Sequence, residues 1–198
     1  MKRRPQRWML LILTSSCIFS SSYCFSSVFL YEHPEELAEK SDAIYIGQVR
    51  SMYSSINEDH GISTYVKFKV LQTVKGPEQS EQIAIVHGGE TTFQGKHFRQ
   101  KIHGAAEFHQ GETVMVMIKY VKQRPIIQYF GAKLLLRENA QSGGKEWVRQ
   151  IPSNVEFAQE HGDSEHAGFH IEKSAYMKEE VFDYQQTLHN IQAQEKRP

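Results

Sequence analysis

The stretch from Ile62 to Gly89 reads ISTYVKFKVLQTVKGPEQSEQIAIVHGG and decides the class of fold. Within it, Val66, Phe68 and Val70 fall on every second position, and a lysine follows each of the first two. Successive side chains of a β-strand point to opposite faces, so this pattern places the apolar residues on one face and the lysines in water. The pattern therefore predicts a half-buried strand over residues 64–74.

A second strand follows after a break. Lys75-Gly76-Pro77 ends the first run, because proline offers no N–H to a strand ladder and glycine tolerates the dihedral angles of a turn. Residues 82–86 then repeat the alternation with Ile83 and Ile85. We interpret the two runs as an antiparallel pair. Since one pair alone is barely stable in water, further strands must cover its apolar face.

Other segments have the apolar composition or the alternation of strands. Their bounds are 43–52, 113–120, 126–130, 132–136 and 145–151. The second of them is apolar on both faces, which predicts a strand covered on both sides, as in a closed barrel with further structure packed outside. Gly47, in the middle of the first segment, predicts the bulge or bend that barrel corners need. Together these segments predict a mainly β domain, a closed barrel over residues 28–150.

A helix is predicted near each end. Residues 33–40 have Pro34 at a first helical position and acidic side chains at the positive end of the helix dipole, which favours a short N-terminal helix. Near the C-terminus, an apolar stripe with helical spacing predicts an amphipathic helix over about residues 175–194, capped by Ser174. The stripe consists of Met177, Val181, Tyr184, Leu188 and Ile191. We therefore expect residues 151–198 to form an extension whose helix packs on the barrel or on a second copy, giving a homo-oligomer.

Residues 1–26 have the three parts of a secretory signal peptide. A basic start, an apolar run at residues 8–13 and a tract of small residues at 20–27 follow one another. The apolar run is far too short to cross a bilayer, which takes about 20 residues. We therefore expect export, either periplasmic or secreted, and no transmembrane segment in the mature chain.

Both cysteines, Cys17 and Cys24, lie inside that segment. Cleavage near Ser26 leaves a mature chain without a thiol, so that packing and not a set of disulfides must stabilise it. One alternative stays open, because Thr14-Ser15-Ser16-Cys17 distantly resembles the lipobox, in which an acylated cysteine becomes the mature N-terminus. On that interpretation the chain is a structural envelope lipoprotein, lipid-anchored through Cys17.

The balance of charge bears on the class of partner. The whole chain has 23 basic and 23 acidic residues. Four of the basic residues and none of the acidic ones lie in residues 1–26, which leaves 19 basic against 23 acidic in the mature chain. This mild acidity argues against a nucleic-acid partner, whose binding is driven by neutralisation of phosphates.

Four motifs resemble those of a group of uncharacterised bacterial exported proteins. They are SDAIYIGQV at 41–49, TYVKFKVL at 64–71 with VKG at 74–76, GGE at 88–90, and FHQGETVMV at 108–116. In its architecture that group resembles the netrin-like and metalloproteinase-inhibitor domains, which are OB-type barrels of five strands. The resemblance implies export and an OB-like antiparallel barrel of five to six strands. The N-terminal cysteine through which the animal inhibitors chelate zinc has no counterpart in the mature chain, so no mechanism carries over.

The connection from Gly88 to Gln110 is predicted to form a contact surface. It is long and carries aromatic and histidine side chains without a regular pattern, and such connections are uncommon in compact domains unless they are functional or mobile. The candidate binding residues are Gly88, Gly89, Glu90, Phe93, His97, Phe98 and His103. The double glycine is more simply a tight turn than a phosphate-binding nest, because the lysine and helix of a P-loop do not follow it.

A second cluster of candidate residues lies in the C-terminal extension. His161, His166 and His170 stand among acidic residues, and these are the ligand types that Zn(II) and Cu(II) prefer. Their spacing differs from that of zinc-protease helices, in which two histidines lie four residues apart around a glutamate. A surface run of histidines is the simpler interpretation, and a zinc or copper site is the alternative.

The sequence favours a non-catalytic binding protein over an enzyme. It contains no Gly-x-Ser-x-Gly motif, and no cysteine is left after cleavage to act as a nucleophile. We expect a protein or glycan partner outside the cytoplasm, held by the 88–110 connection and one face of the barrel, without a cofactor. The alternatives are the structural lipoprotein and a metal-binding protein or metal-dependent hydrolase that uses His161, His166 and His170.

Overall fold

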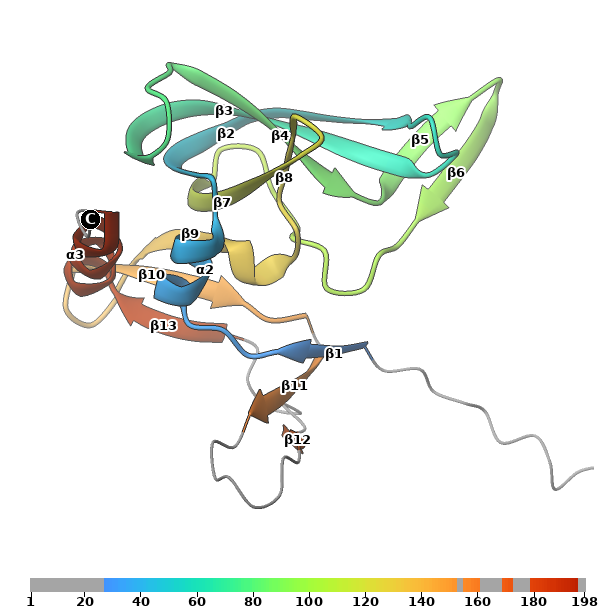
Figure 1. Cartoon of the computed structure of the whole chain (residues 1–198). Coiled ribbons are helices and arrows are strands. Elements are labelled where there is room, and N and C mark those ends of the chain that lie inside the picture. Colours follow the sequence, from blue (N-terminus) through green and yellow to red (C-terminus); the bar gives the residue numbers. More distant parts are fainter. Residues whose placement is uncertain (1–26, 153–154, 161–168, 173–178, 196–198) are drawn as a thin grey trace, which may run out of the picture.

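The computed structural model describes residues 27–152, 155–160, 169–172 and 179–195. This part of the chain is mainly β, with a short helix near its N-terminal end and a longer helix at its C-terminal end (Figure 1), as the sequence predicts. The helices are α2 (Pro34–Lys40) and α3 (Tyr184–Glu195), and a 3-10 turn, η1, spans Phe130–Ala132. Neither of these helices has both the length and the apolar character that crossing a membrane demands.

Five strands pair in a ring. β2 (Ala43–Ile56), β3 (Ile62–Lys75) and β4 (Glu81–His87) follow one another as an antiparallel meander. β7 (Thr113–Val121) pairs antiparallel with β2, and β8 (Arg124–Ile126) pairs antiparallel with β7 and parallel with β4. The order around the ring is therefore β2-β3-β4-β8-β7 and back to β2. The central antiparallel pair predicted from the sequence is confirmed as β3 and β4.

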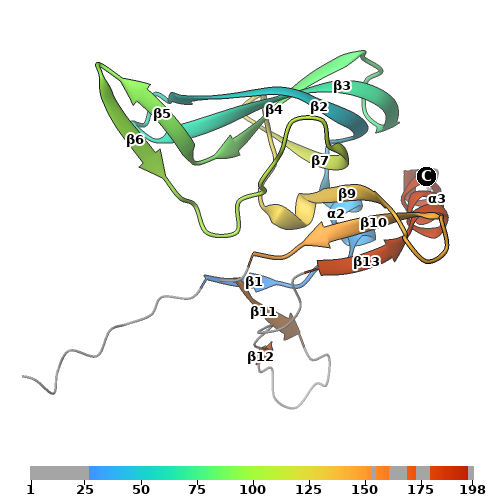
Figure 2. The same ribbon diagram turned by 180° about the vertical axis from the view of Figure 1, so that it is seen from behind.

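The sheet divides at β7, because one edge of this strand has two partners in turn. Its first half pairs with β9 (Lys133–Glu138) and its second half with β8. From β9 the sheet continues antiparallel through β10 (Lys145–Gln150) to β13 (Glu179–Asp183), as Figures 1 and 2 show. The prediction of a strand over residues 126–130 is wrong, since β8 ends at Ile126 and η1 then turns the chain toward β9.

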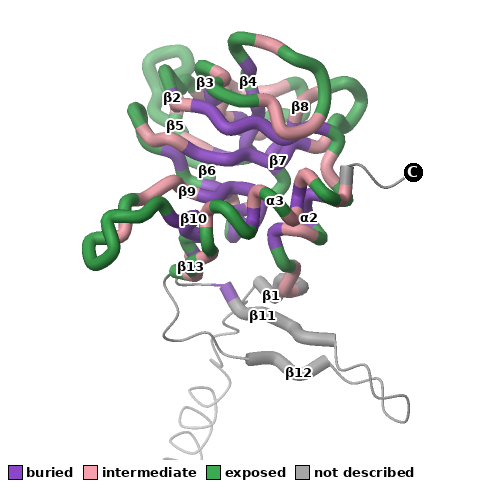
Figure 3. Tube along the Cα trace, turned by 90° about the vertical axis from the view of Figure 1, so that its left-hand side faces the viewer, coloured by how far each residue is buried: buried purple, intermediate pink, exposed green. Residues whose placement is uncertain are grey.

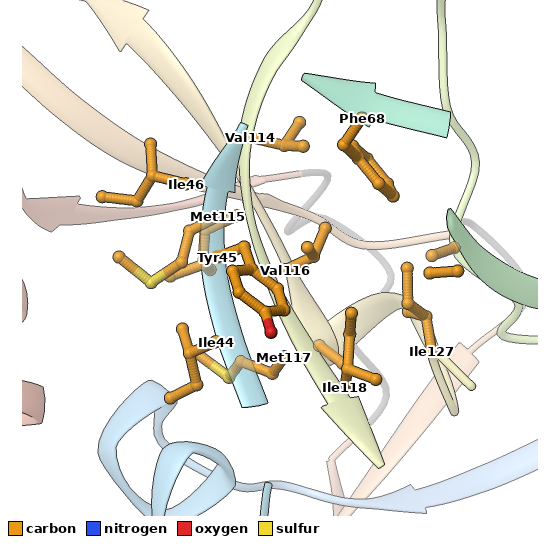
Figure 4. Close-up of a cluster of buried hydrophobic side chains, with 14 of the residues drawn as sticks. Ile44, Tyr45, Ile46, Phe68, Val114, Met115, Val116, Met117, Ile118 and Ile127 are labelled. Atoms are coloured by element: carbon orange, nitrogen blue, oxygen red, sulfur yellow. The ribbon is translucent and has the colours of Figure 1, made fainter. Parts of the chain in front are cut away.

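Both faces of β2 and β7 are covered, which confirms the expectation from the apolar pattern of residues 113–120. Figure 3 shows buried residues running along these strands and β9. On the side that faces α2 lie Ile44, Ile46, Met115 and Met117 (Figure 4). On the other side lie Tyr45, Val114, Val116, Ile118 and, from β3, Phe68 (Figure 4). Each of these side chains is at most 5% exposed, and burial of one such group contributes about 1.5–3 kcal/mol.

The two helices pack against each other and against the sheet. Leu37 and Ala38 of α2 are buried in the same core as Ile191 of α3. The amide of Asn190 donates a hydrogen bond to Glu35 Oε1 at 3.1 Å, which links the helices directly. The apolar side of α3 is therefore used within the chain.

The prediction of a helix over residues 175–194 is wrong in its first part. Residue Val181 belongs to β13 and is 54% exposed, and α3 begins directly after that strand. The cap of the helix is Asp183, whose Oδ1 accepts a hydrogen bond from the Gln186 N–H at 2.7 Å. The proposed cap, Ser174, lies outside the described residues, as do residues 175–178. Helical spacing of apolar residues upstream of the cap misled the prediction, because strand pairing with β10 decides the structure there.

A smaller sheet lies beside the main one. β1 (Ser27–Leu30) pairs parallel with β11 (Val155–Glu160), and β11 pairs antiparallel with β12 (Phe169–Glu172). Residues 155–160 and 169–172 of the predicted C-terminal extension are therefore strands, which the sequence analysis did not predict. Their partner β1 is distant in sequence, so the local pattern gives no sign of the pairing. The signal peptide predicted for residues 1–26 lies outside the described residues.

Candidate functional site

The connection between β4 and β7 contains a hairpin, which corrects the expectation of an irregular segment from residue 88 to 110. β5 (Gly89–Phe93) and β6 (Lys96–Gln100) pair antiparallel around a two-residue turn. The turn residues Gln94 and Gly95 have φ of 49° and 74°, and such positive values fit the tight turns that join antiparallel strands. The hairpin projects at one end of the ring (Figures 1 and 2). Glutamine-glycine is a weaker hairpin signal than asparagine-glycine, which explains why the sequence pattern missed it.

A groove of about 650 Å³ lies between the ring and the segment that follows the hairpin. The inner face of β2, β3 and β4 contributes side chains to it: Met52, Ser54, Thr64, Val66 and Val86. The remaining lining comes from Tyr53 and from residues 87–90, 99–102 and 105–109. A concave site of this size, apolar with a few polar groups, is typical of ligand-binding sites.

Gly88 and Gly89 carry the chain across the inner face of β2 and β3. Both have positive φ, at 93° and 131°. A Cβ atom on Gly89 would lie 2.6 Å from the Ser54 hydroxyl oxygen and closer still to that of Thr64. The Thr64 hydroxyl donates a hydrogen bond to the Gly88 carbonyl at 2.7 Å and lies 2.9 Å from the Ser54 hydroxyl. The two glycines thus line the groove and are also required by its close packing.

The two phenylalanines of the hairpin share one of its faces. Thr91 pairs with Phe98, and Phe93 lies two residues beyond Thr91, so both rings point to the same side. Phe93 is 52% exposed and Phe98 is 41% exposed. Neither ring lines the groove, and the hairpin therefore presents a separate apolar face next to it.

The opposite face of the hairpin is charged. Glu90 pairs with Arg99 across the strands, with 2.9 Å between Oε1 and Nε. His97 Nε2 lies 3.6 Å from the other oxygen of the same carboxylate. All three side chains are at least half exposed, so their attraction stabilises the hairpin little. Glu90 lines the groove, whereas His97 and His103 do not.

Lys133 holds the segment that separates this groove from a second cavity of about 330 Å³. Its Nζ donates hydrogen bonds to the Glu107 carbonyl at 2.6 Å and to Glu112 Oε2 at 2.9 Å. The lysine is 4% exposed and lines the second cavity. Sequence reasoning missed it, although a single lysine within the apolar run of residues 126–136 was a signal for a buried ion pair.

The described residues do not test the predicted metal site. No group of three histidine, cysteine, aspartate or glutamate side chains in that part of the chain is close enough to hold an ion. His161 and His166 lie outside the described residues, and of His170 only the backbone, in β12, lies within them. The zinc or copper hypothesis for these histidines stays a prediction.

Three groups with perturbed pKa values, Tyr31, Glu32 and Tyr129, lie around the segment before α2, away from the groove. Burial raises the pKa of Tyr31 to about 12, and burial with a hydrogen bond to Glu32 raises that of Tyr129 further. Desolvation opposes ionisation of Glu32, but hydrogen bonds from Lys40 and Tyr129 outweigh it and lower its pKa. None of these groups lines either cavity, so we interpret them as ties that hold the N-terminal segment.

A pair of stacked tyrosines lies on the outer face of β2 and β3, opposite the side chains that line the groove. Tyr53 and Tyr65 are neighbours across β2 and β3, with ring centres 4.9 Å apart and ring planes 7° from parallel. Tyr53 is 57% exposed.

Comparison of the chain with protein-family models, with curated protein sequences and with solved structures gave no match.

Proposed function

We propose that this chain is an exported, non-catalytic binding protein that holds a protein partner outside the cytoplasm. The partner is bound by the groove and by the phenylalanine face of the β5–β6 hairpin. The observation that carries the proposal is the position of that face, with Phe93 and Phe98 at 52% and 41% exposure, beside a groove of about 650 Å³. Large aromatic side chains are enriched in protein interfaces, where covering them with a partner is favourable.

Two of the carboxylates near the groove support binding over acid–base chemistry. Glu90 and Glu112 are both engaged in ion pairs, with Arg99 and Lys133 respectively. Each of these carboxylates is thereby held as an acceptor for a neighbouring cation. A glycan is the alternative partner, and the exposed ring of Tyr53 on the outer face of β2 is the feature that favours it.

We further propose that the ring of β2, β3, β4, β8 and β7 is an OB-type barrel, as in the netrin-like domains that the sequence motifs resemble. The number of strands in the ring and its mixed pairing, with one parallel contact between Ile85 and Ile126, support this. OB-type barrels bind ligands with one sheet face and the neighbouring loops, which agrees with a binding role.

A double variant tests the binding surface. Phe93→Ser/Phe98→Ser removes the apolar face of the hairpin while leaving its turn and strand pairing in place. We expect the variant to fold and to lose the partner that the wild-type protein retains from envelope and extracellular extracts. Leu71→Ser is the matched control, because Leu71 is 55% exposed on β3 and does not line the groove. Retention of the same partner by the double variant would exclude the hairpin as the contact surface.

The intact mass of the exported product tests the route of export. Cleavage near Ser26 removes Cys17 altogether, whereas a lipoprotein retains this cysteine with a diacylglycerol. We expect a mass that fits a chain beginning at or near Ser27. A mass that includes a diacylglycerol would contradict this expectation and favour the lipid-anchored protein.

A further inference from the structure

Part of β2 has a free backbone edge. β7 pairs with β2 only over residues 43–48, and two further hydrogen bonds join Val49 to Gly111 and Glu112 at 2.9 Å each. β2 continues to Ile56, paired on its other edge with β3. Within the described residues, no backbone hydrogen bond joins residues 50–56 to any segment other than β3.

This free edge lies along the groove. Met52, Tyr53 and Ser54 are consecutive residues of β2, and all three line the groove. The opposite wall is the segment from residue 101 to 109, which Lys133 holds in place. The groove is therefore bounded on one side by strand backbone whose outward N–H and C=O groups have no protein partner among the described residues.

Exposed strand edges are usually blocked, because a row of unpaired N–H and C=O groups attracts other strands. Charged side chains and proline are the common blocking devices. Residues 51–56 read SMYSSI and contain neither. The only charge near the start of this edge is Arg50, at the point where the register with β3 shifts. The edge is thus open, and residues 50–53 at its start are exposed.

From this arrangement we infer that the groove takes an extended peptide segment of a partner protein, which adds to β2 as a further strand. The inference rests on the proposed function and names the chemistry of its ligand. Backbone dipoles of alternating direction along residues 51–56 are complementary to another extended backbone. Six residues of strand span about 20 Å, so the added segment has a similar length.

The groove also specifies the side chains of that segment. Met52 and Ile102 are 37% and 39% exposed and both line the groove. Alternate side chains of an added strand point to the same face, so every second residue of the peptide faces these two and is apolar. One cation and one carboxylate, Lys101 and Glu107, line the groove without an ion pair to another described residue. This balance of charge gives no attraction for a polyanion.

A second copy of the chain is the competing occupant of the edge, since two free strand edges also pair with each other. The groove beside the edge favours a separate peptide, whose side chains fill it as its backbone pairs with β2.

Backbone methylation of a bound peptide tests the inference. A library of eight-residue peptides with apolar residues at alternate positions is screened against the purified protein, and the best binder is measured by calorimetry. The same peptide is then N-methylated at one residue at a time. We expect methylation at alternate residues, those that face β2, to weaken binding about tenfold each, and methylation at the residues between them to change it little. On binding, alternate amides of residues 51–56 should become protected from hydrogen exchange.

Two variants complete the test and separate it from the proposed function. Met52→Lys places a charge on the edge and is expected to abolish peptide binding, whereas the exposed control Leu71→Lys leaves it intact. If Phe93→Ser/Phe98→Ser loses the natural partner but N-methylation shows no alternation, or no library peptide binds, the strand-addition inference fails and the binding function stands. Protection of residues 51–56 in a concentration-dependent dimer would likewise overturn the inference, in favour of a second copy as the occupant.

Discussion

Lys133 and Glu112 form an ion pair inside the protein, with 2.9 Å between Nζ and Oε2. The lysine side chain is 4% exposed and that of the glutamate 15%. The same ammonium group lies 4.8 Å from the centre of the Phe108 ring and donates to the Glu107 carbonyl at 2.6 Å. One lysine of β9 thereby fixes the segment between the hairpin and β7, which forms a wall of both cavities.

Removing one partner of this pair is expected to be costly. Glu112→Ala leaves an ammonium group in the interior without its carboxylate, which lowers the free energy of unfolding by about 3 kcal/mol. The double variant Lys133→Met/Glu112→Leu removes both charges and should lower the free energy of unfolding by less than Glu112→Ala does. Urea unfolding followed by the fluorescence of the buried Trp147 measures both effects. Glu81→Ala is the control, because its ion pair with a lysine is exposed and contributes below about 1 kcal/mol. Equal losses at the two sites would contradict this account.

Gly89 and Gly95 are expected to respond differently to alanine, although both have positive φ. A Cβ on Gly89 meets the hydroxyl groups of Ser54 and Thr64, whereas nothing lies within 4 Å of a Cβ on Gly95. For Gly89→Ala, backbone strain and overpacking together are expected to lower the free energy of unfolding by about 3 kcal/mol or more. For Gly95→Ala, backbone strain alone is expected to lower it by about 1 kcal/mol. Thermal unfolding of the two variants measures the difference. A similar shift in Tm for both variants would mean that the hydroxyl groups of Ser54 and Thr64 move aside and accommodate the Cβ atom at position 89.

Stability in acid is expected to depend on Asp42, which joins the start of β2 to the end of β7. Its carboxylate accepts hydrogen bonds from the Lys119 ammonium at 2.8 Å and from the Tyr120 N–H at 2.7 Å. These bonds hold the pKa of Asp42 below its ordinary value of 3.8. Because the folded pKa is the lower one, the ionised carboxylate stabilises the fold above the unfolded pKa, and this contribution disappears as the pH falls through the folded pKa.

The measurement for Asp42 is the urea midpoint of the wild type and of Asp42→Asn between pH 7 and pH 2. We expect the wild type to be the more stable near neutrality and the two midpoints to converge in acid, since protonation gives the wild type a neutral side chain as well. A constant difference across the whole range would show that the charge of Asp42 is not the stabilising feature.

The metal hypothesis makes its own prediction for the C-terminal histidines. If they form a site, Zn(II) or Cu(II) binds with micromolar affinity, and His161→Ala/His166→Ala/His170→Ala removes that binding. Affinity should fall below about pH 6, where imidazole is protonated. The control is His97→Ala/His103→Ala, which changes two histidines of the β4–β7 connection. Calorimetric titration that shows no binding, or binding unchanged in the triple variant, rejects the site.

The sequence predicted the faces of the strands better than their partners. Alternation around Val66 and Phe68 placed both residues correctly in the interior, where they are fully buried. The ring, however, closes through a parallel contact between Ile85 and Ile126, and a period of two residues identifies a buried face without naming the neighbouring strand. The pairing of β1 with β11 was missed for the same reason.

The sequence pattern drew attention to only part of the groove. The double glycine lies in its lining, but the groove also depends on Met52 and Lys133, which stand within strands and carry no local signal of a site. A free strand edge is likewise invisible in a sequence, because it depends on where the neighbouring strand stops. In this chain β7 stops short of the last residues of β2.

The cap of α3 offers a test of where the helix begins. Asp183 Oδ1 accepts a hydrogen bond from the Gln186 N–H at 2.7 Å, and its carboxylate lies at the positive end of the helix dipole. Asp183→Ala should therefore lower the free energy of unfolding by about 1 kcal/mol, whereas Asp183→Asn should retain most of the cap. Ser174→Ala is the discriminating control, because the sequence pattern places the cap there. Urea unfolding in which Ser174→Ala costs as much as Asp183→Ala would move the start of the helix back to the position that the apolar stripe first indicated.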